Sequence, residues 1–302
     1  GVHGSTEAGA LHVESGGSLT FGSGDLTAFS GFTAKGTNTV TSTGGGDILI
    51  KGRTNNGFMN SHGHTGVNIT GDYKIDFDTD ALHDIRGNMA ITAANITYLH
   101  GGRTYSFWTT ATTNTVTFTG NLNISGSSAE LNTLASGQEA ADAFTVTGDA
   151  ILTGNLTAND TTISLGSLRV DGTYSATSGT TIITSERSNG RAIDIVGTYT
   201  HNSGTLEIRT PADTDLRCPS SSSLNDLTIN HASCIARPTG DNKPPIGGGL
   251  TITAGTFNTL DSDGGSSHAL TVTGDVSVTG TLTGNASAIS MGSLTINDGG
   301  TY

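Results

Sequence analysis

The sequence predicts an all-β chain folded as an elongated parallel β-solenoid, and three observations support this prediction. First, residues 144–168 and 270–294, which lie 126 positions apart, are identical at 15 of 25 positions. Second, Gly accounts for 44 of 302 residues, while charged residues make up 13%, against roughly 25% in ordinary globular domains. Third, apolar and polar residues alternate in short runs, as in half-buried strands. Repetition at a fixed offset is typical of stacked repeats, and we expect right-handed coils.

The hydrophobic pattern near the end of the chain defines the expected strands. Leu270, Val276, Leu282, Ala288 and Leu294 are six residues apart, and each begins a short run that ends in a turn-forming residue. This pattern predicts strands of three to five residues separated by turns. Three such strands would complete one coil of about 20 residues, and coils would stack at about 4.8 Å. The whole chain would then form about 15 coils.

The repeat divides the chain into three regions. Residues 1–115 are expected to form a divergent solenoid with insertions, and 116–241 one full repeat unit that ends in a loop containing Cys and Pro. Residues 242–302 begin the next unit. These are repeat boundaries and not hinges between independent domains. Because the chain ends at Gly299-Gly-Thr-Tyr302, in the middle of a unit, we expect it to be a segment of a longer polypeptide.

Three other classes of chain fit the sequence less well. A disordered chain would contain fewer of the Thr, Val and Ile residues that favour pleated strands. A β-sandwich array would carry longer strands and more aromatic core residues, whereas this chain has a single Trp. A β-propeller would need several blades of similar length, and the single offset of 126 residues does not provide them.

The charge of the chain limits its partners. The formal net charge is −13, which argues against duplex nucleic acid as a partner, because binding to phosphates needs clustered Lys and Arg. The sequence contains no apolar run long enough to span a bilayer, so we expect no membrane insertion. A negative charge of this size fits a soluble, extracellular, self-repelling surface.

The strongest candidate for chemistry is the acidic run Asp76-Phe-Asp-Thr-Asp80. On a strand, Asp76, Asp78 and Asp80 would project from one face, where they would repel one another unless a cation or solvent screens them. Oxygen ligands suit Ca²⁺, so a calcium site is one reading. A pair of carboxylates cleaving a glycosidic bond, as in polysaccharide depolymerases, is another. The third reading is a solvated acidic strand face, and no further cofactor is expected.

Two further sets of residues are candidates for a structural or binding role. Cys218 and Cys234 lie in the segment that contains all five prolines, where the alternatives are a disulfide and two buried thiols. Tyr105, Phe107 and Trp108 are the aromatic candidates for contact with a cell-surface glycan. Since Phe107 and Trp108 are adjacent, they would point to opposite faces of a strand. Core packing or contact with a neighbouring chain are the alternatives for these aromatic residues.

The amino-acid sequences of the repeats resemble those of a known group of proteins. The phrases Leu270-Thr-Val-Thr-Gly-Asp275, Gly292-Ser-Leu-Thr-Ile296 and Gly172-Thr-Tyr-Ser-Ala-Thr-Ser-Gly179 resemble repeat-rich fibre proteins of marine tailed bacteriophages. The resemblance covers about residues 116–302. Similar Thr/Gly/Val-rich solenoids also occur in bacterial surface adhesins. The resemblance implies a multimeric rod in a virion or outside the cell, and it carries no catalytic motif.

The expected function is therefore that of a non-enzymatic structural or adhesive fibre segment of a phage virion appendage. It would span to the host surface or contact it, and its partners would be copies of itself, other virion or filament proteins, or a cell-surface glycan. Two alternatives stay open. One is a secreted bacterial adhesin or filament subunit with the same fold. The other is a polysaccharide depolymerase that uses Asp76, Asp78 and Asp80.

Overall fold

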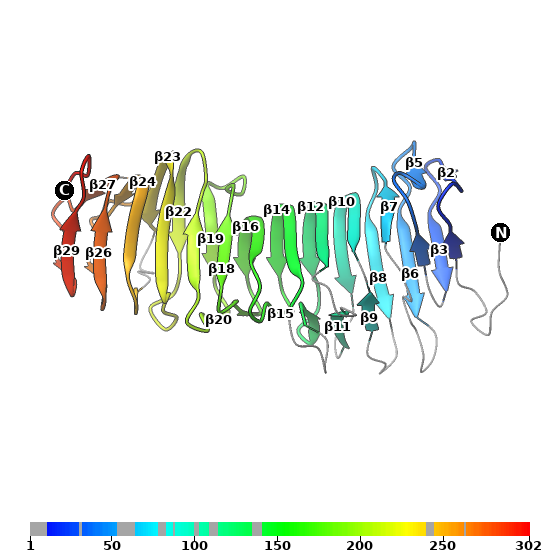
Figure 1. Cartoon of the computed structure of the whole chain (residues 1–302), viewed down its shortest axis with the longest axis horizontal. Coiled ribbons are helices and arrows are strands. Elements are labelled where there is room, and N and C mark those ends of the chain that lie inside the picture. Colours follow the sequence, from blue (N-terminus) through cyan, green and yellow to red (C-terminus); the bar gives the residue numbers. More distant parts are fainter. Residues whose placement is uncertain are drawn as a thin grey trace. The chain divides into compact units, whose positions relative to one another are not determined.

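The computed structural model describes residues 11–29, 32–52, 64–77, 83–86, 88–99, 103–108, 114–134, 141–239, 245–262 and 264–302. All regular elements in these ranges are β-strands, which pair in parallel and stack as a β-solenoid of about 10 turns (Figure 1). The predicted fold class is therefore confirmed. Within the described ranges, no helix is long and apolar enough to cross a membrane. The chain forms two compact units, residues 1–161 and 162–302.

Unit 1, residues 1–161, builds its coils from three ladders of parallel strands. One ladder contains β2, β5 and β7, and a second contains β3, β6 and β8; the long strands β10, β12 and β14 belong to both. The third ladder contains β9, β11, β13 and β15. The strands of unit 1 are β1 (Leu11–Val13), β2 (Leu19–Phe21), β3 (Leu26–Phe29), β4 (Phe32–Ala34), β5 (Val40–Ser42), β6 (Ile48–Gly52), β7 (His64–Asn68), β8 (Tyr73–Phe77), β9 (His83–Arg86), β10 (Met89–Leu99), β11 (Arg103–Trp108), β12 (Thr115–Ile124), β13 (Ala129–Asn132), β14 (Ala143–Leu152) and β15 (Asn155–Thr157).

Unit 2, residues 162–302, uses the same plan. One ladder runs β16–β18–β21–β23–β24–β26–β29, and another runs β16–β19–β22–β23–β24–β27. The third face carries the pairs β17–β20 and β25–β28. The strands of unit 2 are β16 (Ile163–Val170), β17 (Thr173–Ser175), β18 (Thr180–Ile183), β19 (Arg191–Ile195), β20 (Thr198–Thr200), β21 (Thr205–Ile208), β22 (Asp213–Arg217), β23 (Asp226–Pro238), β24 (Leu250–Asn258), β25 (Leu270–Thr271), β26 (Asp275–Val278), β27 (Thr281–Thr283), β28 (Ile289–Ser290) and β29 (Ser293–Ile296).

The coils differ in length, which corrects the expected 20 residues per coil and 15 coils. Val116 pairs with Phe144, so this coil takes 28 residues, whereas Val276 pairs with Leu294, so that coil takes 18. Several strands are also longer than the expected three to five residues, because one strand turns the corner between two ladders. β23 has 13 residues and β10 has 11. Longer coils mean fewer coils for the same chain.

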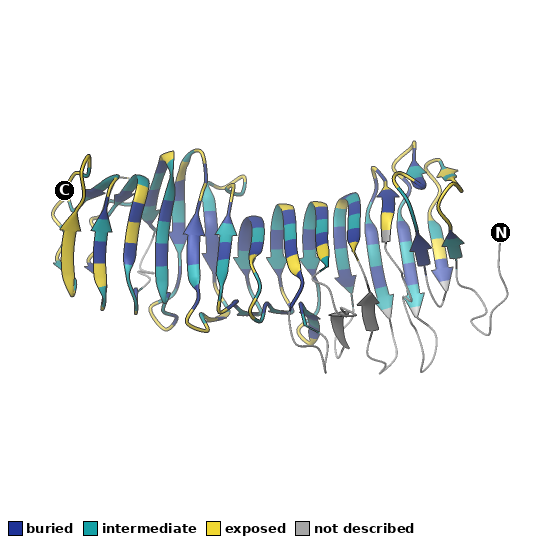
Figure 2. Ribbon diagram, viewed as in Figure 1, coloured by how far each residue is buried: buried dark blue, intermediate teal, exposed yellow. Residues whose placement is uncertain are grey.

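Each coil buries one side of its strands. In β12, Val116, Phe118 and Leu122 are at most 1% exposed, while the residues between them are half-buried or exposed. Figure 2 shows this alternation along the strands of both units. Aromatic rings on successive coils also pack together: Phe118 and Phe144 meet edge to face with ring centroids 5.3 Å apart. The core is thus a column of side chains stacked from coil to coil.

The corner in β12 depends on glycine. Gly120 has φ = 134°, a backbone conformation that other residues rarely adopt. A Cβ atom at this position would also collide with the carbonyl oxygen of Ala93 on the preceding coil. Gly120 therefore allows one continuous strand to bend from the first ladder of unit 1 into the second.

The two compact units divide the chain differently from the sequence repeat. The units divide after Thr161, whereas the predicted repeat boundaries fall after residues 115 and 241. The repeat describes which stretches of sequence are alike. The compact units describe which residues are in contact, and their boundary falls inside the first copy of the repeated block, residues 144–168, whereas the second copy, 270–294, lies within unit 2.

Candidate functional site

The predicted acidic run is only partly within the described residues. Asp76 lies in β8, is half-buried, and stands in register between Lys51 of β6 and Leu99 of β10. Asp78 and Asp80 lie outside the described residues. Across the ranges that the structure describes, no three His, Cys, Asp or Glu side chains gather as a metal site would require. The calcium and depolymerase interpretations of this run stay predictions.

The predicted aromatic residues share one strand. Tyr105, Phe107 and Trp108 belong to β11, which pairs in parallel with β9 and β13. The backbone of β11 is part of the third ladder of unit 1, and the side chains of these three residues lie outside what the structure describes. Their contact with a glycan stays a prediction.

Of the two alternatives for the cysteines, the structure has the buried thiols, and the disulfide is not formed there. Both are buried, and each contacts different neighbours. Cys218 Sγ lies 3.5 Å from the carbonyl oxygen of Ser222, and Cys234 Sγ lies 3.4 Å from Thr210 Oγ1. Burial raises the pKa of Cys218 to about 12 and also raises the pKa of Cys234. A buried thiol that holds its proton is a poor nucleophile, so these residues act as packing groups.

In unit 1, a row of Asp and Asn side chains lies where the strands of the second ladder begin. We call it the Asp/Asn ladder. Asp47 Oδ1 accepts a hydrogen bond of 2.8 Å from the backbone N–H of Asp72, one coil further on, and Asp72 Oδ1 accepts one of 2.8 Å from Asn95 Nδ2. Asn95 Oδ1 in turn accepts a bond of 3.2 Å from Asn121 Nδ2. The members of the ladder are Asp25, Asp47, Asp72, Asn95 and Asn121.

Lys74 neutralises the acidic part of the Asp/Asn ladder. Its Nζ lies 2.5 Å from Asp47 Oδ2 and 3.4 Å from Asp72 Oδ2. Burial pushes the pKa of Asp47 upward, but the hydrogen bonds from Lys74 and from the backbone of Asp72 outweigh it, so the pKa lies below its ordinary value. The carboxylates of Asp47 and Asp72 are thus held in hydrogen bonds between coils and in ion pairs with Lys74.

A second polar corner is built twice, once in each unit, and we call it the repeated corner. Asn159 Nδ2 donates to Asn132 Oδ1 at 2.7 Å, and Asn285 Nδ2 donates to Asn258 Oδ1 at 2.7 Å. The two pairs are related by the 126-residue offset of the sequence repeat. Asn159 and Asn285 also share a positive φ, 51° and 47°, which Asn tolerates better than most residues. The repeat therefore preserves bonds between coils.

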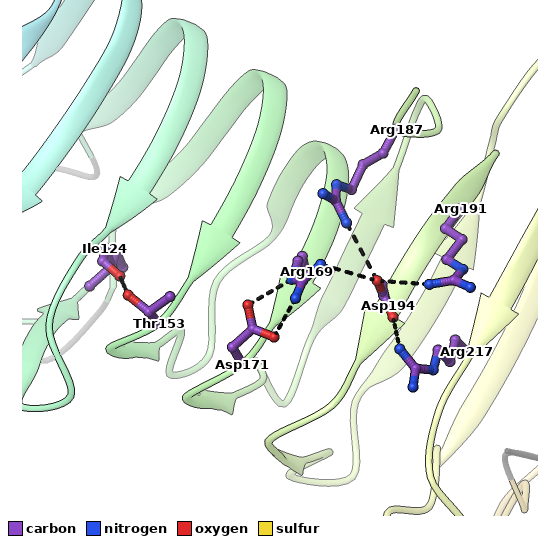
Figure 3. Close-up of polar contacts among 8 residues, drawn as sticks. All are labelled: Ile124, Thr153, Arg169, Asp171, Arg187, Arg191, Asp194 and Arg217. Atoms are coloured by element: carbon purple, nitrogen blue, oxygen red, sulfur yellow. Dashed lines mark hydrogen bonds and ion pairs between the residues drawn. The ribbon is translucent and has the colours of Figure 1, made fainter. Parts of the chain in front are cut away.

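Among the residues that the structure describes, the densest charged group is in unit 2, where four arginines surround one carboxylate (Figure 3). We call it the arginine cluster. The Asp194 side chain is 0% exposed. Its Oδ1 lies 3.1 Å from Arg217 Nη1, and its Oδ2 lies 3.2 Å from Arg191 Nη1. Arg187 Nη1 and Arg169 Nη1 lie 3.4 Å and 3.8 Å from the same Oδ2. Arg169 also binds Asp171 through two hydrogen bonds of 2.6 and 2.9 Å.

Strand register assembles this cluster. Arg169 of β16, Asp194 of β19 and Arg217 of β22 stand opposite one another on three successive coils. Arg191 is three residues from Asp194 and would face the other way in a regular strand. A register shift between Arg191 and Ile193 inserts one extra residue, and such a bulge brings Arg191 to the side of Asp194.

No local pattern in the sequence predicts the arginine cluster. Its members are spread over residues 169–217 with no fixed spacing, and the coils that bring them together differ in length. The single hint is that five of the 13 basic residues of this acidic chain, the four of the cluster and Arg209, lie in that stretch.

Comparison of the chain with models of protein families, with curated proteins and with solved structures finds no match. The resemblance of the repeats to fibre proteins of tailed phages therefore stays an expectation from the sequence.

Proposed function

We propose that this chain is a non-enzymatic structural segment of a fibre on a phage virion appendage, where it spans towards the host surface or contacts it. The observation that carries the proposal is the repeated corner. The 126-residue repeat keeps the same Asn–Asn bond, at 2.7 Å, between coils of both units. Repetition has thus preserved the contacts that stack coils, which is what a chain used as a scaffold needs.

The polar ladders and the charge support the same proposal. The Asp/Asn ladder ties successive coils of unit 1 together by hydrogen bonds between side chains and backbone. A net charge of −13 favours a surface that repels copies of itself laterally. The setting on a virion comes from the resemblance of the repeat phrases alone.

The test is to locate the chain in its source sample by immunogold electron microscopy. An antibody raised against residues 250–302 can reach the folded chain, because residues 292–299 are all exposed. We expect gold on phage particles, on an appendage of the head or tail. Antibody absorbed beforehand with the same segment is the control and should leave the particles unlabelled. Gold on cell envelopes or on free filaments would contradict the virion setting and favour the bacterial adhesin.

A further inference from the structure

We propose that the arginine cluster binds a tetrahedral oxyanion, a sulfate or phosphate group, on its solvent side. The arginines of the cluster lie outside the carboxylate that they pair with. Asp194 lies between the buried residues Ile193 and Ile195, so the period of two places its side chain on the outer face of the sheet. Its side chain is nevertheless 0% exposed, whereas those of Arg191 and Arg217 are 30% and 34% exposed. The guanidinium groups cover the carboxylate and form the outer surface.

The cluster also carries an excess of positive charge. Four guanidinium groups converge on Asp194, and Asp171 pairs with one of them, Arg169. Two positive charges are left over in a chain whose net charge is −13. Asp215 stands opposite Arg191 in register and accepts a hydrogen bond of 3.0 Å from Ser262 Oγ. Even when Asp215 is counted, the arginines outnumber the carboxylates by one. A bound anion would balance this excess.

The arginines of the cluster keep N–H groups that Asp194 does not use. A guanidinium group carries five N–H donors, and Arg187, Arg191 and Arg217 each direct only Nη1 to Asp194. Nε and Nη2 of Arg191 and Arg217 have no hydrogen-bond partner in the described part of the chain. Arg187 Nε is buried and also lacks a partner there. Convergent guanidinium forks match the oxygens of sulfate and phosphate in geometry as well as in charge.

The sequence of unit 2 offers a matched control for this site. Arg209 has the same charge and is 45% exposed, but it forms a one-to-one pair with Glu207, to which Nε and Nη2 donate hydrogen bonds of 2.7 and 2.8 Å. Burial raises the pKa of Glu207, but the bonds from Arg209 and Asn230 outweigh it and hold the pKa below its ordinary value. Arg209 is thus an arginine outside the cluster whose charge is balanced by one carboxylate.

The experiment is isothermal titration calorimetry of the full chain with sodium sulfate and with sodium phosphate at pH 7, each at constant ionic strength. We expect saturable binding at one site. Arg217→Gln should weaken it by about tenfold or more, because one charged hydrogen-bonding group is lost. Arg191→Lys keeps the charge but removes the fork, and we expect a similar loss. Arg209→Gln should leave the affinity within about twofold of the parent chain.

Two results would overturn the proposal. One is the absence of saturable binding of either anion to the parent chain. The other is equal weakening by Arg209→Gln and Arg217→Gln, which would reduce the effect to net charge. If Arg217→Gln does not fold, Arg191→Lys, which retains the charge around Asp194, decides the question in its place.

A last arm identifies the source of the oxyanion. A sulfated oligosaccharide and its desulfated counterpart are titrated in the same way. Tighter binding of the sulfated form than of inorganic sulfate would assign the site to a group carried on a glycan. Binding of the inorganic ions alone would assign it to a free anion. Both outcomes support the oxyanion site, and neither depends on where the chain is found in the source sample.

Discussion

The Asp/Asn ladder of unit 1 and the arginine cluster of unit 2 are both stacked across successive coils, but they neutralise their carboxylates in different ways. In the ladder, Asp47 and Asp72 accept bonds from backbone N–H or amide groups one coil further on and share Lys74. In the cluster, Asp194 pairs with four arginines, two from its own coil and one from each neighbouring coil.

The difference follows from the geometry of a parallel stack. Residues in register lie about 4.8 Å apart, so identical charges on successive coils would repel. The ladder limits this repulsion by placing Lys74 against Asp47 and Asp72 and by continuing as the neutral residues Asn95 and Asn121. The cluster solves it by alternating sign, as Arg169, Asp194 and Arg217. A row of amides can be repeated on any number of coils, whereas a single buried carboxylate with four arginines is a closed, local arrangement. The row of amides therefore suits a structural role, and the arginine cluster suits the binding site that we propose.

The largest effect is expected from breaking the cluster at its centre. Asp194→Asn leaves four guanidinium groups facing one another without the buried carboxylate, and should lower the free energy of unfolding by about 3–5 kcal/mol. Denaturant unfolding in a buffer without sulfate or phosphate measures this change. Asp213→Asn is the control, because Asp213 is 61% exposed and pairs with Arg237 at 3.5 Å. It should change the same quantity by no more than about 0.5 kcal/mol. Equal losses in the two variants would contradict the central role of Asp194.

Asp142 is a carboxylate in a third kind of environment. Asp142 is buried with neither an arginine nor a ladder around it: Oδ1 accepts a bond of 3.0 Å from the backbone N–H of Asn114, and Oδ2 is buried without a partner among the described residues. Burial raises the pKa of Asp142 to about 6, against the lowering effect of the bond from Asn114. Because the folded state holds a proton that the unfolded state releases, the stability contributed by this group is full below about pH 4. It is lost as the pH rises to about 6.

The measurement for Asp142 is the free energy of unfolding between pH 4 and pH 7, in the parent chain and in Asp142→Asn. Asn is neutral at every pH, so the variant should lack the fall of about 2–3 kcal/mol that Asp142 causes. The difference between the two proteins should therefore grow in favour of the variant as the pH rises. Identical pH profiles would show that Asp142 does not titrate in this range.

A smaller effect is expected from adding a charge to the ladder. Asn95→Asp removes the donor to Asp72 Oδ1 and places a carboxylate against a carboxylate, which should cost about 1–2 kcal/mol of stability. Thermal or denaturant unfolding at low salt and at about 1 M NaCl measures it, since salt should recover part of the loss. Asn123→Asp adds the same charge at a site whose side chain reaches only Thr97 Oγ1 at 3.5 Å. A loss in Asn123→Asp as large as that in Asn95→Asp would argue against stacking as the cause.

The smallest effect is expected from Lys74→Met, which keeps an unbranched side chain of similar length but removes the ammonium group. Lys74 is 33% exposed, so its two ion pairs should contribute only about 0.5–1 kcal/mol, and the effect should vanish in about 1 M NaCl. In the double variant with Asn95→Asp, the losses should exceed their sum, because both changes act on Asp72. Strictly additive losses would indicate that the two positions act independently.

The repeated corner was within reach of sequence reasoning, whereas the arginine cluster was not. Asn132-Thr-Leu134 and Asn258-Thr-Leu260 align at the offset of 126 residues, so equal sequence on equal coils gives equal bonds. The cluster has no such repeat. Its members come from coils of different length, and the position of Arg191 depends on a bulge that no residue pattern announces.

The sequence by itself determined that this chain is an all-β stack of coils, because alternating apolar residues and closely spaced turn formers are local properties of the chain. The tertiary structure decided which side chains lie next to each other. Coils of 18 to 28 residues mean that the partner of a residue cannot be counted from a fixed period. Only the register of the folded strands places Arg169 and Arg217 on either side of Asp194, and buries that carboxylate under charge of the opposite sign.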